Sequence, residues 1–274
     1  MLVGENERLR ELIMNSVLVY HSISTPAEAM PGDIDISPAR FEQQLARLRN
    51  TKRVVRLEDA LARKSTRQIA ITFDDGYRDN LTVALPLLEK YNLPMTLFMV
   101  AGFVDSDGYL SADELREISR HPLITIGAHG LWHRHFNRIS RDEARFELTE
   151  SRRLLEETIE RKVDLMAWPF GECTPALEEL AGECGYRAAW SVWKGSNGSF
   201  SRWRVPLGRN DHMLRFVAKC SGLYGLTEAR LHRYQERRRH ASARATNSPA
   251  LITDVKTSSY GSLDAHFSRP EVLK

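Results

Sequence analysis

The stretch IAITFDDGY at residues 69–77 decides the fold of this 274-residue chain. Its first five residues form an apolar run, as in strands that helices cover on both faces. Two adjacent carboxylates, Asp74 and Asp75, follow at once, and the active sites of parallel βα folds gather at this carboxyl end of the strands. Neighbouring residues that leave a strand point in different directions, so one carboxylate can bind a cation while the other remains a base. The alternative is a turn in which Asp-Asp-Gly only caps the next helix.

The same pattern continues along the chain from residue 17 to about residue 208. Short apolar runs alternate with amphipathic stretches, which predicts parallel strands joined by helices. Besides residues 69–73, the predicted strands are Val17–Tyr20, Thr96–Val100, Ile124–Ala128, Leu165–Trp168, Ala188–Val192 and Arg204–Leu207. Capping patterns predict helix starts at Ser111 with Glu114, Ser140 with Glu143, Thr174 with Pro175, and Pro38, and Gly185 is placed to end a helix.

The composition is that of an ordinary globular protein, with 42% hydrophobic and 27% charged residues, in a chain long enough to bury a substantial core. The formal net charge of +3 provides no global field that would favour nucleic acid as a partner. Positive charge does gather near the C-terminus, where the alternatives are a solvated helix face and a docking patch for a membrane surface or a lipid-linked substrate. This basic cluster consists of Arg230, Arg233, Arg237, Arg238 and Arg239.

Sequence features also bear on the compartment. No stretch approaches the ~20 continuous apolar residues of a membrane-spanning helix. Residues 1–15 mix Glu and Arg with apolar residues, whereas a secretory signal has a basic start and then an unbroken apolar run. The three cysteines form no C-x-x-C pair, which suits a reducing compartment. We therefore expect a cytoplasmic protein.

Two histidines follow the predicted strand at residues 124–128. His129 and His133 are close enough in sequence for a helical turn or a tight loop to bring both imidazoles to one cation. With Asp75 they form a set of two histidines and one carboxylate, which is typical of a catalytic site that keeps a position open for water. His135 is a spare candidate, more typical of a structural or supporting role.

A turn-forming segment, Trp168-Pro169-Phe170-Gly171, lies at the end of another predicted strand. Pro fixes the backbone and Gly permits a sharp turn, so the N–H of Phe170 can point into the site. An N–H held there would stabilise the oxyanion of a tetrahedral intermediate. Because Pro-aromatic-Gly turns are common, this segment indicates a catalytic site only in combination with the Asp74-Asp75 segment and the His129–His133 segment.

Together these segments resemble the polysaccharide deacetylase family, also called the NodB-homology domain. Residues 72–77 match its T-F-D-D-G-[YW] motif, residues 129–133 its H-x-x-x-H motif, and residues 169–171 its P-[YF]-G segment. Flanking residues 19–22, 41–45 and 185–189 resemble a bacterial branch that includes exopolysaccharide, peptidoglycan and chitin deacetylases. The resemblance covers roughly residues 17–210 and implies an α/β fold, a distorted (β/α)7 barrel with seven strands.

The resemblance also implies roles for the central residues. Asp74 is the base, and Asp75, His129 and His133 bind a divalent metal, usually zinc in this family, with cobalt and nickel as alternatives. The metal polarises the acetamide carbonyl and lowers the pKa of its water, and Asp74 removes the proton.

The remaining catalytic roles fall to an oxyanion donor and a general acid. The Phe170 N–H is the expected donor to the oxyanion. His212, with Asp211 able to orient it, is the first candidate for the acid that donates a proton to the departing sugar amine. His21, at the end of the first strand, is the second.

Two departures from the family pattern bear on the site. Gly130 stands where the family usually has Ser or Thr, whose hydroxyl steadies the metal-site loop, so the metal affinity is expected to be lower. Ala167 stands where many members have an Arg that orients the base, although the resembled branch often lacks it too. Four tryptophans are candidates either for stacking on a sugar ring or for the core, namely Trp168, Trp190, Trp193 and Trp203.

These observations predict four segments: a lead-in at residues 1–16, a metal-dependent deacetylase domain at 17–212, a basic helical extension at 213–240 and a flexible tail at 241–274. The favoured function is removal of acetyl groups from N-acetylated amino sugars of a bacterial glycan or its biosynthetic intermediate. An ester or non-sugar amide hydrolase with the same metal site is one alternative. A glycan-binding module that has lost catalysis is another, favoured by Gly130 and Ala167.

Overall fold

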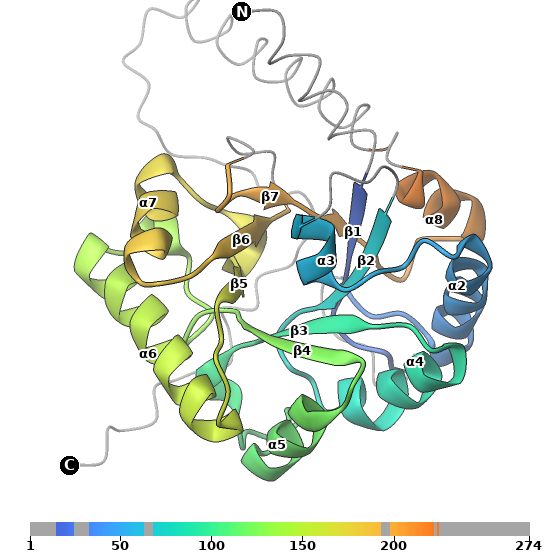
Figure 1. The fold of residues 1–274 in the computed structure, drawn as a ribbon, viewed down its shortest axis with the longest axis horizontal. Coiled ribbons are helices and arrows are strands. Elements are labelled where there is room, and N and C mark those ends of the chain that lie inside the picture. Colours follow the sequence, from blue (N-terminus) through green and yellow to red (C-terminus); the bar gives the residue numbers. More distant parts are fainter. Residues whose placement is uncertain (1–14, 25–32, 63–67, 193–197, 222–223, 225–274) are drawn as a thin grey trace, which may run out of the picture.

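A computed structural model describes residues 15–24, 33–62, 68–192, 198–221 and 224 (Figure 1). Its strands form an eight-stranded, all-parallel sheet in the order β7-β6-β5-β4-β3-β2-β1-β8. The strands are β1 (Asn15–Tyr20), β2 (Gln68–Phe73), β3 (Met95–Met99), β4 (Ile124–Ala128), β5 (Leu165–Ala167), β6 (Ala188–Ser191), β7 (Arg202–Trp203) and β8 (Val205–Pro206).

One short stretch of chain closes the sheet. β7 pairs with β6, β8 pairs with β1, and Arg204 lies between them. The sheet therefore curls into a barrel whose last strand is divided, and the carboxyl ends of all the strands lie at the same end of it.

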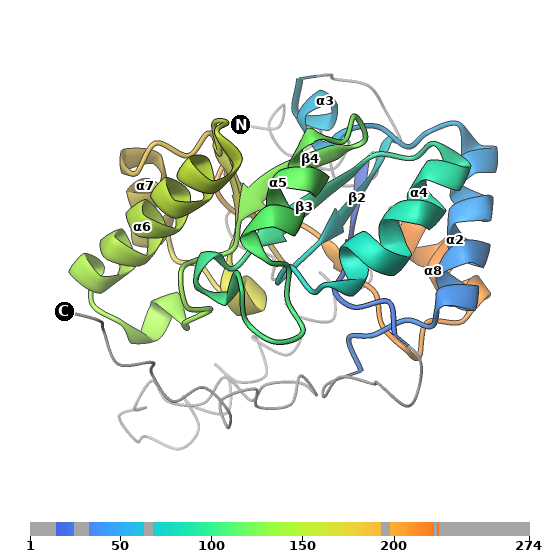
Figure 2. The same ribbon diagram turned by 90° about the horizontal axis from the view of Figure 1, so that it is seen from below.

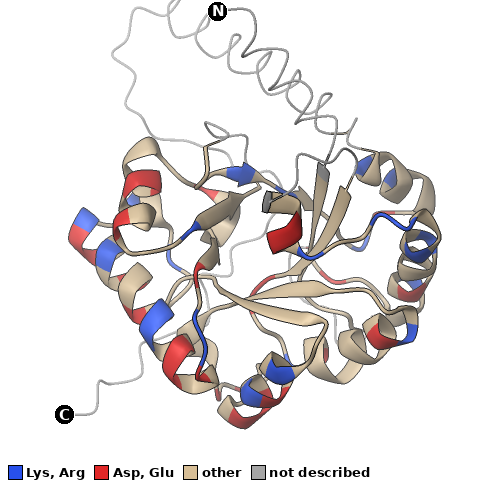
Figure 3. Cartoon of the chain, in the orientation of Figure 1, with Lys and Arg blue, Asp and Glu red and all other residues tan. Residues whose placement is uncertain are grey.

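Helices surround this barrel (Figure 1, Figure 2) and carry much of the charge on their outer sides (Figure 3). The α-helices are α2 (Pro38–Thr51), α3 (Leu57–Ala62), α4 (Leu85–Tyr91), α5 (Ala112–Arg120), α6 (Arg141–Ile159), α7 (Pro175–Glu183) and α8 (Met213–Cys220). Shorter helical turns follow the carboxyl ends of several strands, namely η2 (Asn80–Ala84), η3 (Ala101–Phe103), η4 (Phe136–Arg138) and η5 (Pro169–Gly171).

The alternation of side chains along the strands produces two buried clusters. Along β2, Ile69, Ile71 and Phe73 belong to the large cluster that packs against the helices. Ala70 belongs to a smaller inner cluster with Leu57, Phe98, Leu165, Ala167, Ala188 and Trp190. Thr72 and Asp74 continue the inner alternation, which places the Asp74 side chain at the carboxyl end of the barrel interior.

The predicted barrel is confirmed, and so are its helix starts. Ser111 and Ser140 form complete capping boxes with Glu114 and Glu143. The Thr174 hydroxyl accepts from the N–H of Leu177 at the start of α7, and α2 begins at Pro38 as expected. At Ser111, Ser140 and Thr174, side-chain hydrogen bonds to the first backbone N–H groups therefore set where the helix begins.

The last predicted strand, residues 204–207, contains β8, which pairs with β1. The sequence did not predict β7, which pairs with β6 on the other side of Arg204. The basic cluster at 230–239, the tail at 241–274, Trp193 and most of the lead-in lie outside the described residues. Within the described residues, no helix combines the length and apolar character that a membrane crossing requires.

Candidate metal and base site

Two carboxylates leave the carboxyl end of β2 side by side. Asp74 and Asp75 are only 3% and 5% exposed. The Asp74 N–H still donates to the Tyr20 carbonyl, continuing the pairing with β1, at 3.0 Å. Asp75 then turns into the left-handed region, at φ 71°, which is unusual for a residue with a side chain. Such strain persists where the surrounding structure holds it in place, and it gives the two carboxylates different directions.

The two histidines come from the loop after β4. The His129 N–H donates to the Met99 carbonyl at 2.7 Å, and His133 is also left-handed, at φ 52°. The Nδ1 atom of His129 lies 2.8 Å from the Ala167 carbonyl oxygen, which can only accept a hydrogen bond. Nδ1 therefore carries the proton, and Nε2 presents its lone pair to the site.

Three side chains converge on one point. The Asp75 Oδ1 atom lies 3.6 Å from His129 Nε2 and 3.4 Å from His133 Nε2, and all three potential ligand atoms lie within 4.8 Å of one another. Ligands at ~2.0–2.1 Å from a tetrahedral zinc ion are separated by about 3.4 Å. Asp75 Oδ1 is buried and has no hydrogen-bond partner. A buried, unpartnered carboxylate oxygen facing two imidazole nitrogens fits a divalent cation.

The pKa shifts agree with this interpretation. Burial raises the pKa of Asp75, and the neighbouring Asp74 charge adds to the rise, while His21 and His129 oppose it. Burial lowers the pKa of His129 to about 4. His129 is therefore neutral near pH 7, as a metal ligand must be, and burial makes the charged form of Asp75 less favourable than it is in water.

Asp74 is held by a fully buried arginine that sequence reasoning missed. The Arg204 guanidinium donates from Nη1 to Oδ1 at 2.6 Å and from Nη2 to Oδ2 at 2.7 Å. Nη1 also lies 3.3 Å from the Thr72 hydroxyl, and the guanidinium lies over the Phe98 ring, 5.2 Å from its centroid. This planar, two-bond contact fixes the direction of the carboxylate.

Arg204 also sets the charge of Asp74. Burial is the largest influence and raises the pKa, but the Arg204 charge, His129 and the Arg204 hydrogen bonds together outweigh it and lower the pKa of Asp74 to about 2. Asp74 is therefore a carboxylate at any physiological pH. Arg204, in the segment that closes the barrel, thus orients the Asp74 carboxylate, which the short side chain of Ala167 cannot do.

A sequence signal for Arg204 existed. A charged residue that begins an otherwise apolar strand of a barrel must find a partner inside, because an unpaired buried charge is costly. Ala167 belongs to the inner cluster, and so does Phe98, on which Arg204 stacks. The small Ala167 side chain and the large Arg204 side chain therefore both lie in the barrel interior.

His21 also reaches the site. It is the strongest charged influence on Asp75 and also acts on Asp74. Its Nδ1 atom is buried and has no hydrogen-bond partner. The Asn80 amide donates to the His21 carbonyl at 2.8 Å from the first residue of η2, a π-helical turn of the kind that often occurs at functional sites.

Phe170 lies beside the metal cluster. It adopts a left-handed conformation, φ 57°, inside the η5 turn. Its ring centroid lies 4.5 Å from that of His133 and 3.6 Å from that of His135, on which it stacks. His135 pairs with Glu172 at 3.2 Å, which agrees with a supporting role.

No described contact joins His212 to the group formed by Asp75, His129 and His133. His212 is exposed and caps the start of α8, where its Nδ1 accepts from the Arg215 N–H at 3.4 Å. Asp211 binds Lys219 at 2.8 Å and Arg215 at 3.2 Å. Asp211 is therefore engaged with two cations of α8, and its expected role of orienting His212 has no support in these contacts.

The tryptophans divide by burial. Trp168 and Trp190 are fully buried, which supports the core alternative for these two residues. Trp203 is partly buried, and its indole N–H donates to the Val192 carbonyl at 3.2 Å. Trp132, between His129 and His133 in the sequence, is 46% exposed.

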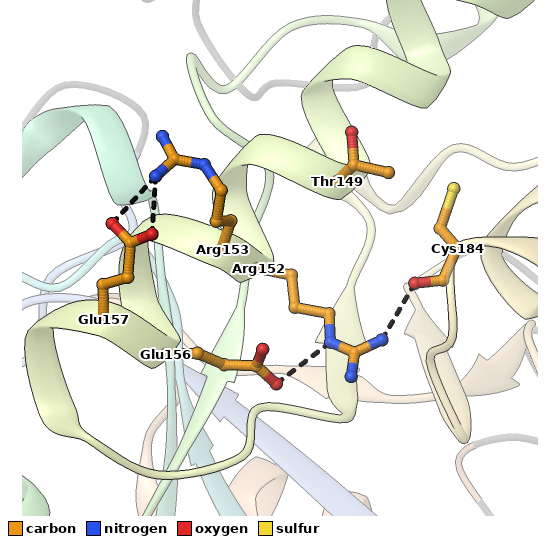
Figure 4. A pocket seen from close by; sticks show the side chains of 6 residues that line it. All are labelled: Thr149, Arg152, Arg153, Glu156, Glu157 and Cys184. Carbon is orange, nitrogen blue, oxygen red and sulfur yellow. Dashed lines mark hydrogen bonds and ion pairs between the residues drawn. The ribbon is translucent and has the colours of Figure 1, made fainter.

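A second hollow, of about 470 Å³, lies on the outer side of α6 and the end of α7 (Figure 4). Its charged residues already neutralise one another, Arg152 with Glu156 and Arg153 with Glu157. These residues belong to the half of α6 that leads into β5, at the opposite end of the barrel from Asp74. The hollow is therefore separate from the metal cluster. Its lining comprises Thr149, Arg152, Arg153, Glu156, Glu157 and Cys184.

The chain is similar to known polysaccharide deacetylases. The family model for polysaccharide deacetylase matches residues 62–189. A relative from Bacillus subtilis (strain 168), named "Putative polysaccharide deacetylase YxkH", is 25% identical over 178 residues, covering 62% of each chain. The chain thus spans less than two thirds of that relative's length.

Solved structures share the fold. BC0361, a polysaccharide deacetylase from Bacillus cereus, is 24% identical with a TM-score of 0.69, over 76% of this chain and 69% of that one. The Streptococcus pyogenes deacetylase PplD, solved in complex with acetate, is 21% identical with a TM-score of 0.67, over 76% of this chain and 98% of that one. With the barrel and the matched motifs, these findings show that the chain is similar to polysaccharide deacetylases, over residues 62–189 in the family model.

Proposed function

We propose that this protein is a metal-dependent hydrolase that removes acetyl groups from N-acetylated amino sugars of a glycan or its biosynthetic intermediate. The observation that carries the proposal is the pairing of two neighbouring carboxylates with different partners. Asp75 faces His129 and His133, while Asp74 is held by Arg204. The family match and the deacetylase names of the relatives support the acetyl group and the glycan as substrate.

Asp75, His129 and His133 would hold the cation, most simply zinc, with cobalt or nickel as alternatives. When bound, it polarises a carbonyl oxygen and makes a water molecule more acidic. Asp74 takes up the proton of the attacking water on the carboxylate that Arg204 orients. With a pKa of about 2, Asp74 is a weak base, so it depends on a water of increased acidity.

Two further roles complete the reaction. We assign to the N–H of Phe170 the stabilisation of the negative charge that develops on the acetyl oxygen; the ring of this residue packs against that of His133, so Phe170 is a neighbour of the candidate metal site. We assign donation of the proton to the departing amine to His21, which follows β1 directly and has a buried, unpartnered Nδ1, whereas His212 caps α8.

The first experiment joins metal removal to acetate release. Protein loaded with zinc should release acetate from N-acetylated oligosaccharides, chelation should abolish the release, and zinc or cobalt should restore it. Acetate is measured by a coupled enzymatic assay and metal content by elemental analysis. If the protein bound no stoichiometric metal, the proposed mechanism would fail.

A substrate panel separates the alternatives. Release of acetate from an aryl acetate but from no N-acetylated sugar would favour an esterase. Binding of oligosaccharide without release from any substrate would favour a glycan-binding module.

The proposed acid is tested by replacing His21 with Gln. Loss of a proton donor to a poor leaving group lowers kcat by about 10²–10⁴-fold. The loss should shrink on an aryl acetate, whose leaving group needs no proton, and metal content should stay at the parent level. His212→Gln is the matched control and should leave kcat within about threefold of the parent. Equal losses for both variants, or an unchanged His21→Gln enzyme, would remove His21 from the mechanism.

A further inference from the structure

A buried carboxylate from an outer helix reaches the loop that joins the two histidines. Glu147 belongs to α6 and is only 1% exposed. Its Oε2 atom accepts hydrogen bonds from the backbone N–H groups of Leu131 and Trp132, both at 2.9 Å. These N–H groups lie within the three-residue connection between His129 and His133, and one side-chain oxygen satisfies both.

The carbonyl side of the same connection is fixed by the segment after β3. The Ala101 N–H donates to the Gly130 carbonyl at 3.1 Å, and the Gly102 N–H donates to the Leu131 carbonyl at 2.8 Å. The backbone of the loop is thus held through its carbonyl groups by η3 and through its N–H groups by Glu147. Without the carboxylate, two buried donors would lose their partner.

The conformation at Gly130 explains why a distant residue is needed. Gly130 has φ 79°, a left-handed conformation that any side chain would strain. A Cβ atom added there would lie 3.3 Å from Pro169 Cγ and 3.4 Å from Phe136 Cε2. A serine or threonine hydroxyl therefore cannot steady this loop from position 130 without strain. Such a Cβ would lie 3.7 Å from Glu147 Oε2, so the Glu147 carboxylate already approaches this place.

We propose that Glu147 is a positioning residue for the metal site, which sets the separation of His129 and His133 by binding the N–H groups of Leu131 and Trp132. This inference rests on the proposed function only in that the two histidines bind a cation. The acceptor geometry of Glu147 carries the effect, and its charge does not. A residue on α6, with no contact to the cation, thereby controls its affinity.

Three substitutions separate geometry from charge. Glu147→Gln keeps an oxygen at the same reach and should leave the dissociation constant for Zn²⁺ within about threefold of the parent. Glu147→Asp keeps the charge but is one methylene shorter, and Glu147→Leu removes the acceptor. Both should weaken Zn²⁺ binding by about 10–100-fold, the range found when a supporting partner of a metal ligand is lost. Binding is measured by calorimetry, and ligand geometry by the visible spectrum of the Co²⁺-loaded protein.

Ser151→Ala is the matched control. Ser151 is buried on the same face of α6 and bonds only to Leu148 and Tyr186, so its loss should lower the melting temperature while leaving the Zn²⁺ affinity and the Co²⁺ spectrum unchanged. If the Asp and Leu variants bound Zn²⁺ as the parent does, or if the Gln variant lost as much affinity as Leu, the inference would be overturned. If the parent itself failed to bind Zn²⁺, the proposed function would fail instead.

Discussion

Replacing Asp74 with Asn should reduce acetate release by about 10²–10⁴-fold, the usual contribution of a general base. The amide cannot take up the proton, while Asp75, His129 and His133 remain in place to bind metal. The variant also leaves the Arg204 charge buried beside a neutral partner, so its free energy of unfolding should fall as well. Acetate release, metal content and thermal unfolding are measured on the same preparation.

Asp35→Asn controls for loss of an ion pair made by a buried aspartate, here with the half-exposed Arg209. Asp35 is buried and binds Arg209 at 2.5 Å, but no described contact joins it to the metal cluster. Its replacement should lower stability without comparable loss of activity. An Asp74→Asn enzyme that retained parental kcat with full metal content would show that another group is the base.

Replacing Arg204 with Met should produce the largest combined effect on stability and pH dependence. Removing one partner of a buried ion pair costs about 3–5 kcal/mol, because the other charge stays buried and alone. Burial, which raises the pKa of Asp74, would then be opposed only by the weaker histidine interactions. A protonated Asp74 cannot act as base, so activity should be lost on acidification at a higher pH than in the parent, where Arg204 lowers the pKa of Asp74.

The measurement is kcat against pH for the parent, Arg204→Met and Arg204→Lys. Lys keeps the charge but loses the two-bond contact, so its acidic limb should lie between the other two. Arg209→Met, which breaks the Asp35 pair, should leave the profile unchanged. A parental pH profile in Arg204→Met would contradict the role assigned to Arg204.

The elements that sequence predicted well share one property, namely that their signals are local. The strand at 69–73, the capping boxes at Ser111 and Ser140, and the His129–His133 spacing each depend on a few neighbouring residues. The apolar run predicts burial on both faces, and the cap satisfies the first N–H groups of its own helix. The convergence of Asp75 with the two histidines followed from the rule that carboxyl ends of parallel strands meet.

What the sequence did not predict depends on contacts between distant segments. Arg204 reaches Asp74 only because the last strand divides and crosses between the two sheet edges. Glu147 lies on the apolar face of α6 with Ala144, Leu148 and Ser151, and a carboxylate at such a position is a signal that a buried donor must be near. Neither partner could be named without the fold, since no local pattern links residue 147 to 131 or residue 204 to 74.

The closure of the barrel at residues 202–206 has a consequence for the order of events during synthesis. Asp74 and Arg204 are 130 positions apart, and ribosomes add about 5–20 residues per second. Arg204 is therefore synthesised roughly 6–26 s after Asp74. Before Arg204 is synthesised, excluding water from the barrel interior would bury the Asp74 carboxylate without its ion partner, which is strongly unfavourable. We therefore expect the barrel interior of the nascent chain to stay hydrated, and the Asp74 carboxylate to be oriented only when residues 202–206 close the barrel.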